Sequence, residues 1–191
     1  MPGSDPYVML QCGLQGSAQP FRFGRRANKY VWFHGIAHQY STGDEVLALL
    51  DYSQYFRQTN QRLPDNRVGI FDKLVADRLI VSDVADRWNI TNLGAILFAN
   101  RLSDFDASLA RKAVRFVAYN GKNRAATVTH RLDEQKGYAV GFEGLVSYIN
   151  DLLPKNEHIG QALREAQPQF PELAIRELVA NALIHQDMQH L

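Results

Sequence analysis

PELAIRELVANALIHQD, residues 171–187, decides how the second half of the chain folds, because it predicts one amphipathic helix. Pro171 stands at the first turn, where a helix needs no backbone N–H. At about 100° per residue, Glu177, Asn181 and His185 fall within about 80° of one another on one face. A second stripe, expected to face the core, consists of Ile175, Leu178, Val179 and Ala182.

The polar face of this helix combines residue types that suit a nucleotide site. Mg²⁺ prefers hard oxygen ligands and retains several waters, so the amide oxygen of Asn181 can be a sufficient protein ligand. The Glu177 carboxylate, one helical turn earlier, can orient or deprotonate the water that attacks a γ-phosphate. The same residue types are common on the solvated face of ordinary helices. The spacing by itself therefore favours a solvated face.

The middle of the chain predicts two helices followed by a β-hairpin. Thr42 or Asp44 can cap the first helix, which continues to Tyr55 and Phe56. Residues 64–66 begin the second helix. Two short strands and a short helix capped by Thr91 or Asn92 follow, over residues 79–81, 88–90 and 92–98. Helix, helix and hairpin is the element order of a winged-helix module.

A second hairpin and further helices are predicted between this region and the final helix. Residues 113–119 and 127–132 alternate apolar and polar side chains, and Asn120-Gly121 tolerates positive φ in the connection. Residues 137–153 carry one apolar stripe at helical spacing. A short helix is expected over residues 159–166. The predicted fold class is therefore α+β.

The chain is expected to divide into three parts. Residues 1–40 form a leader and the terminal strand of an upstream domain, the strand lying over residues 29–36. Within the leader, poor order is favoured over a short strand at Tyr7–Leu10. Residues 41–104 form the winged-helix-like module. Residues 108–191 form a second layer that contains the hairpin and the last helices.

Composition limits the class of protein. The 191 residues are 46% hydrophobic and 21% charged, which predicts a packed core. The net charge of +1 gives no overall attraction to nucleic acid or to an anionic membrane. The single cysteine, Cys12, cannot form an internal disulfide, and no signal peptide or membrane-spanning apolar run is found. We therefore expect a cytoplasmic protein with no membrane partner, and a homo-oligomer is left open.

Three stretches of the sequence, in order, resemble one family of ATP-binding proteins. They are residues 89–98 (NITNLGAILF), 136–144 (KGYAVGFEG) and 176–187 (RELVANALIHQD). The last stretch resembles the N-box of the Bergerat-fold ATPases, the group of gyrases, heat-shock chaperones and histidine kinases. Over about residues 43–187 the chain is similar to bacterial ATP-binding transcriptional regulators that are related to RecG-type helicases.

This resemblance implies a fold, a cofactor and roles for residues. The fold is a winged-helix-like module followed by the hairpin and helices that begin a Bergerat-type (histidine-kinase-like) ATPase α/β sandwich. The cofactors are ATP and Mg²⁺, with Glu177 as the general base, Asn181 as the Mg²⁺ ligand, and His185 and Asp187 near the phosphates. In such ATPases, glycine-containing loops of the pocket follow this helix. We therefore expect the nucleotide site to be incomplete in a chain that stops at Leu191, with no ATP turnover.

Basic residues are the candidates for contact with DNA, the partner that the resemblance implies. Six basic residues and no acidic ones lie from Arg111 to Arg131, although a solvated hairpin is favoured over a DNA site there. The stretch from Arg57 to Arg101 has seven basic and five acidic residues, a weak bias for a recognition helix. The residues proposed to contact phosphates are Arg67, Lys73, Arg78, Arg111, Lys112 and Arg124.

Two other functions stay open at this point. The chain can be a nucleotide-independent DNA-binding protein that uses the wing and the basic hairpin. It can also be a protein-interaction module in which the N-box-like helix is purely structural. His34 and His38 are spaced as metal ligands on a helix would be, but no third ligand accompanies them, so they are interpreted as incidental.

Overall fold

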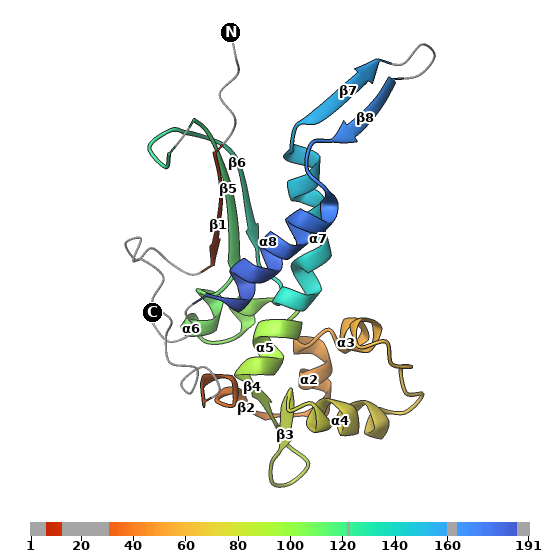
Figure 1. Cartoon of the computed structure of the whole chain (residues 1–191). Coiled ribbons are helices and arrows are strands. Elements are labelled where there is room, and N and C mark those ends of the chain that lie inside the picture. The colour runs from red at the N-terminus through yellow and green to blue at the C-terminus, as the bar shows by residue number, and fades with distance from the viewer. Residues whose placement is uncertain (1–6, 13–30, 122, 160–163, 187–191) are drawn as a thin grey trace.

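The chain folds as a mixed α+β protein, with small antiparallel sheets and helices packed around them (Figure 1). The computed structural model describes residues 7–12, 31–121, 123–159 and 164–186. The strands are β1 (Tyr7–Cys12), β2 (Ile36–Ser41), β3 (Ile80–Ser82), β4 (Trp88–Thr91), β5 (Val114–Asn120), β6 (Thr127–Glu134), β7 (Lys155–Ile159) and β8 (Arg164–Pro168). The helices are α2 (Gly43–Leu49), α3 (Tyr52–Gln58), α4 (Arg67–Ala76), α5 (Asn92–Phe98), the 3₁₀ turn η1 (Leu102–Asp104), α6 (Ala107–Ala110), α7 (Tyr138–Leu152) and α8 (Glu172–Ile184).

Side-chain caps set the helix starts in the first half of the chain. Thr42 and Glu45 form a reciprocal capping box at the start of α2. The helix expected to continue to Tyr55 and Phe56 is instead two helices. It breaks at Leu50, and the Asp51 carboxylate accepts a hydrogen bond from the Gln54 N–H to begin α3. The second predicted helix is present as α4.

The predicted hairpin is present as β3 and β4, and β2 completes its sheet in the order β2-β4-β3. Thr91 caps α5, and its hydroxyl also donates to the Leu79 carbonyl oxygen at 3.0 Å. Gly94 lies so close to β3 that a Cβ there would stand 2.2 Å from the Leu79 oxygen. The local signals of helix, helix and hairpin therefore produce the predicted order of elements.

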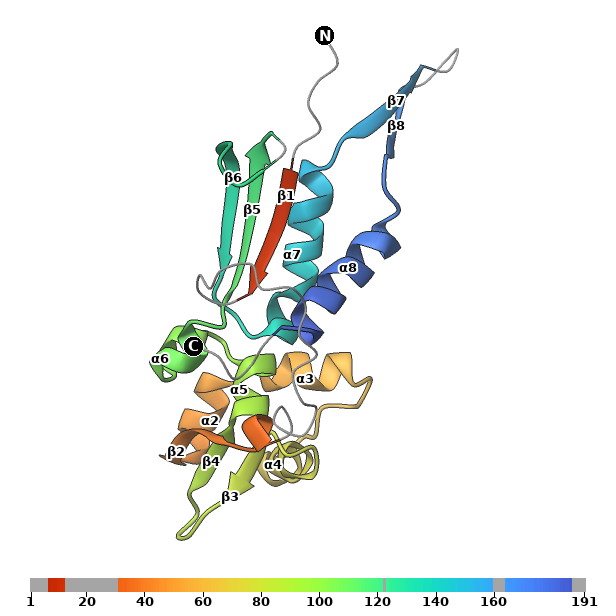
Figure 2. The same ribbon diagram turned by 60° about the vertical axis from the view of Figure 1, so that its left-hand side comes forward.

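The second sheet has the order β1-β5-β6, and α7 and α8 pack beside it (Figure 2). A strand forms over Tyr7–Cys12, where the sequence favours a poorly ordered leader over a short strand at Tyr7–Leu10. It pairs antiparallel with β5 in register from Tyr7↔Tyr119 to Cys12↔Val114. The first described residues thus belong to the same sheet as the predicted second layer. The core of both halves is continuous, since the buried residues of α4, α5, β5, α7 and α8 form one hydrophobic cluster.

Two further predictions of secondary structure are wrong. The strand expected over residues 29–36 is absent from its described part, because residues 31–33 are helical and β2 begins only at Ile36. The amide of Asn92 donates to the Trp32 carbonyl oxygen at 2.8 Å and holds this turn in place. The short helix expected over residues 159–166 is replaced by the β7–β8 hairpin. So short a helix gains little by itself in water, whereas a hairpin pairs its backbone groups.

Within the described ranges, no helix combines the length and the apolar character needed to cross a bilayer.

Candidate functional site

Helix α8 presents the three residues expected at a nucleotide site on one exposed face. Glu177, Asn181 and His185 are all solvent-exposed. None of the three side chains has a hydrogen-bond or ion-pair partner in the described part of the chain. The structure therefore brings these residues together with their polar groups available, while Asp187 lies outside the described residues.

The opposite face of α8 holds the helix against the rest of the protein. Ile175, Val179 and Leu183, four residues apart, are buried with 8%, 3% and 7% of their surface exposed. The expected core stripe is wrong in one position, because Leu178 is 66% exposed. Leu178 lies about 100° around the helix from Val179, the centre of the buried row, and only about 20° from His185, so it falls on the open face. The buried face is thus rotated around the helix toward Leu183, relative to the stripe predicted from the sequence.

The C-terminal end of α8 places His185 just beyond the last helical residue. Its backbone N–H donates to the Asn181 carbonyl oxygen at 3.0 Å. Helix α8 therefore ends at Ile184, three residues before the predicted end at Asp187. Exposed apolar side chains flank the polar groups on this face: Leu173, Leu178 and Ile184. The face is thus a mixed surface of polar groups and uncovered hydrocarbon.

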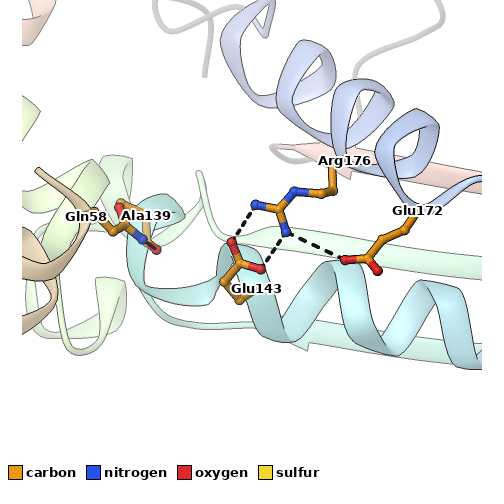
Figure 3. Close-up of polar contacts among 5 residues, drawn as sticks. All are labelled: Gln58, Ala139, Glu143, Glu172 and Arg176. Atoms are coloured by element: carbon orange, nitrogen blue, oxygen red, sulfur yellow. Dashed lines mark hydrogen bonds and ion pairs between the residues drawn. The ribbon is translucent and has the colours of Figure 1, made fainter. Parts of the chain in front are cut away.

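A bidentate ion pair fixes α8 to α7 (Figure 3). Both terminal nitrogens of Arg176 donate to the Glu143 carboxylate, at 2.6 and 2.7 Å. The guanidinium also lies over the Phe142 ring, 5.2 Å from its centroid. A weaker contact of 4.0 Å joins Arg176 to Glu172. Because Arg176 hydrogen-bonds to it, the pKa of the Glu143 carboxyl lies below its ordinary value of 4.5.

Sequence reasoning gave no role to Arg176 or Glu143, although both lie within the quoted family-like stretches. One sequence signal was available. Glu172 and Arg176 are spaced i, i+4 on the predicted helix, which marks Arg176 as an ion-pairing residue. Its principal partner lies on another helix, so helical spacing could not identify Glu143.

A cavity of about 660 Å³ lies beside α8 but does not include its polar triad. Helices α3, α5, α7 and α8 contribute its walls. Its lining residues are Phe33, Gln58, Leu93, Ile96, Leu97, Tyr138, Ala139, Phe142, Glu143, Arg176, Ala180, Leu183 and Ile184. A smaller cavity of about 340 Å³ lies near Arg111, Arg115 and Asp133. Glu177, Asn181 and His185 lie outside both cavities.

The residues proposed to contact DNA do not form one surface. Helix α4, which carries Arg67 and Lys73, and the β5–β6 connection, which carries Arg124, lie at opposite ends of the molecule (Figure 1). Arg67 is paired with Asp44 at 2.8 Å. Lys73, Arg78, Arg111 and Arg124 are exposed.

The prediction that Lys112 contacts DNA is wrong, because only 3% of its surface is exposed. A phosphate cannot reach a side chain that the fold covers in this way. Arg111, its neighbour, remains on the surface and donates through Nε to the Ala107 carbonyl oxygen at 2.9 Å.

The oxygen donors of α8 fit a hard cation better than a transition metal. An amide oxygen at Asn181 and a carboxylate at Glu177, one turn apart, are ligand types that Mg²⁺ accepts together with water. Over the described ranges no group of three or more histidine, cysteine, aspartate or glutamate side chains is arranged to hold a metal ion. His38 Nδ1 lies 2.8 Å from the Ser41 hydroxyl oxygen.

Comparison with known proteins finds no relative of this chain. No family model, no curated protein and no solved structure matches the chain.

Proposed function

We propose that this chain acts in an ATP-binding, DNA-associated regulator of transcription, and that the exposed face of α8 forms one wall of the nucleotide site. One observation carries the proposal. Glu177, Asn181 and His185 are exposed together and have no partner among the described residues, on a helix whose other face is buried. The resemblance of this helix to an N-box supplies the identity of the ligand.

The proposed roles follow from the functional groups. The Asn181 amide oxygen coordinates Mg²⁺, which when bound neutralises charge on the ATP phosphates. The Glu177 carboxylate accepts a hydrogen bond from water and orients it toward the γ-phosphate. The His185 imidazole, at the end of the helix, would contact the phosphates, and the resemblance alone assigns the same role to Asp187, which lies outside the described residues.

Rigid support of α8 favours this role. A nucleotide site needs its ligand groups held in a fixed orientation before the substrate binds. The buried row of Ile175, Val179 and Leu183 fixes the rotation of α8 about its axis. The Arg176–Glu143 pair fixes its position along α7. The antiparallel sheet β1-β5-β6 with α7 and α8 beside it is compatible with the opening part of a Bergerat-type layer.

DNA association is the second element of the proposal. The order α3, α4, β3, β4 is compatible with a winged-helix-like module, and Lys73 and Arg78 are exposed on and just after α4. Asp72 and Asp77 lie among them, so the expected contact is with phosphates, not with bases. Binding to duplex DNA that falls steeply with salt, and that weakens in Lys73→Ala, would support it. Binding insensitive to salt would contradict it.

The nucleotide site is tested by Asn181→Ala in the full-length protein. Binding of Mg·ATP, measured by calorimetry, is expected to weaken by about 10- to 100-fold, since one interaction with a charged group contributes about 1.5–3 kcal/mol. The matched control is Asn150→Ala, which makes the same change on α7, away from the triad. Equal binding by both variants, or no Mg·ATP binding by the unaltered protein, would contradict the proposal.

A further inference from the structure

The larger cavity joins the two halves of the molecule. Phe33, Leu93 and Leu97 line it from the first half, and Phe142 and Leu183 line it from α7 and α8. Its volume of about 660 Å³ falls within the range of about 300–1,000 Å³ that small-molecule sites occupy. The cavity is therefore large enough for an organic molecule, and its walls are carried by α3, α5, α7 and α8, with Phe33.

Most of the lining is hydrocarbon. Ile96, Tyr138 and Leu183 are buried side chains of the core, and they expose carbon atoms to the cavity. Leu93, Leu97 and Phe142 are half-buried and line it as well. A ligand that fills this space must have an apolar aromatic or aliphatic body, because burial of that body supplies the favourable free energy.

The polar side chains of the lining are Gln58, Tyr138, Glu143 and Arg176, and several of their donors are engaged (Figure 3). The Tyr138 hydroxyl donates to the Lys112 carbonyl oxygen at 2.7 Å. The Gln58 Nε2 donates to the Ala139 carbonyl oxygen at 2.5 Å. The two terminal nitrogens of Arg176 donate to Glu143. The groups left to meet a ligand include two acceptors, the Gln58 side-chain oxygen and the unused lone pairs of Glu143, beside the N–H groups of Arg176 that Glu143 does not take.

The charged groups at this end of the cavity also favour a ligand that donates hydrogen bonds. One guanidinium, Arg176, stands with two carboxylates, Glu143 and the more distant Glu172. Glu172 lies outside the lining but 4.0 Å from Arg176, so the three groups together carry a formal charge of −1, which favours a hydrogen-bond donor over an anionic head group.

We propose that the cavity binds a small amphiphilic molecule with an apolar body and an amine or hydroxyl head that donates to Glu143 and Gln58. The site is separate from the face of α8 that carries Glu177, Asn181 and His185. Ala180 and Leu183 of α8 form part of its wall, so an occupant contacts both halves of the protein and stabilises their arrangement. The inference does not depend on nucleotide binding.

A pair of related fluorescent probes tests the ligand class on the full chain. N-phenylnaphthylamine is neutral and carries one N–H donor, and anilinonaphthalene sulfonate adds a negative group to the same scaffold. Saturable binding of the neutral probe, at least about tenfold tighter than that of the sulfonate, is expected. Absence of saturable binding overturns the proposal. This outcome includes the case in which another part of the chain fills the cavity. Tighter binding of the sulfonate overturns it too.

Two variants of α8 locate the site. Ala180→Leu places extra side-chain atoms in the cavity and is expected to weaken the neutral probe by about tenfold or more. Ala174→Leu makes the same change on the exposed face of the same helix and is expected to leave binding unchanged. Circular dichroism establishes that both variants are folded. Equal affinity of the two folded variants places the probe elsewhere and overturns the proposal.

A charge variant tests the head-group preference without changing the packing. Glu143→Gln keeps the size of the side chain and leaves the Arg176 charge unopposed by its main partner. The preference for the neutral probe over the sulfonate is expected to fall by about tenfold. An unchanged preference contradicts the assigned role of Glu143 and overturns the proposal. This variant therefore tests the proposal even if Ala180→Leu fails to fold.

Discussion

Helices α5 and α8 both carry stretches that resemble the same family, yet they are used differently in the molecule. Four of the seven residues of α5 are buried, namely Gly94, Ala95, Ile96 and Phe98. Of the thirteen residues of α8, three are buried in a single row, and its other face is left uncovered.

The difference between the two helices separates structural from functional residues. On α5 the distinctive residues are explained by packing, because Thr91 caps the helix and Gly94 permits close approach to β3. On α8 the exposed side chains of Glu177 and Asn181 have no hydrogen-bond or ion-pair partner among the described residues, so packing does not account for them. Substitution in α5 should therefore affect stability, whereas substitution on the open face of α8 should affect ligand binding alone.

The largest effect is expected for Gly94→Ala. A Cβ at this position would stand 2.2 Å from the Leu79 carbonyl oxygen, and that backbone atom cannot move aside without displacing β3. The free energy of unfolding should fall by about 3 kcal/mol or more, at the upper end of overpacking effects. Urea denaturation monitored by circular dichroism measures the change.

Gly144→Ala is the matched control for this substitution. Gly144 lies in the interior of α7, and a Cβ there meets no atom within 4 Å. The same replacement should raise stability by about 0.5–1 kcal/mol, because alanine favours the helix. A loss of stability at Gly144 similar to that at Gly94 would show that the α5–β3 approach is not the cause.

A smaller effect is expected from a comparison within α8. Ile175→Ala and Leu178→Ala each remove the same number of carbon atoms, from side chains that are 8% and 66% exposed. The first should lower the free energy of unfolding by about 2 kcal/mol, through lost burial and a residual cavity. The second should change it by less than about 0.5 kcal/mol. If Leu178→Ala proved equally destabilising, the open face of α8 would be covered in the native protein.

Local signals explain why much of the first half could be predicted from the sequence. Thr42, Asn66 and Thr91 each accept a hydrogen bond from an N–H three residues later, so the information that starts α2, α4 and α5 lies within one helical turn. The break between α2 and α3 was missed because Asp51 caps the second helix inside an apolar pattern that reads as continuous.

Contacts between distant parts of the chain explain what was missed. Residues 7–12 read as a leader because their partner, β5, lies more than one hundred residues later in the sequence. The choice of which leucine on α8 is buried depends on α7 and the sheet, not on helical period. Glu143 acquires its role only when α7 brings it within hydrogen-bond distance of Arg176. Of the candidate site, sequence predicted the polar face but neither the cavity nor the ion pair beside it.

The smallest effect is expected at the Arg176–Glu143 pair, which attaches α8 to α7. The folded protein lowers the pKa of the Glu143 carboxyl below 4.5, so the pair stabilises the fold above that pH and loses its effect as pH falls through the lowered value. Both side chains are partly solvent-exposed, at 35% for Arg176 and 60% for Glu143. Water and salt therefore screen the interaction, and its contribution to the free energy of unfolding is small.

The measurement is the difference in unfolding free energy between the unaltered protein and Glu143→Gln at neutral pH and again below the carboxyl pKa. The difference should be small but measurable at neutral pH and should disappear in acid. Glu172→Gln, whose carboxylate is 4.0 Å from Arg176, should show a smaller difference at neutral pH and likewise none in acid. If the difference for Glu143→Gln persisted in acid, it would have to come from packing around Phe142 and not from charge. The buried row of Ile175, Val179 and Leu183 would then be what positions the open face of α8.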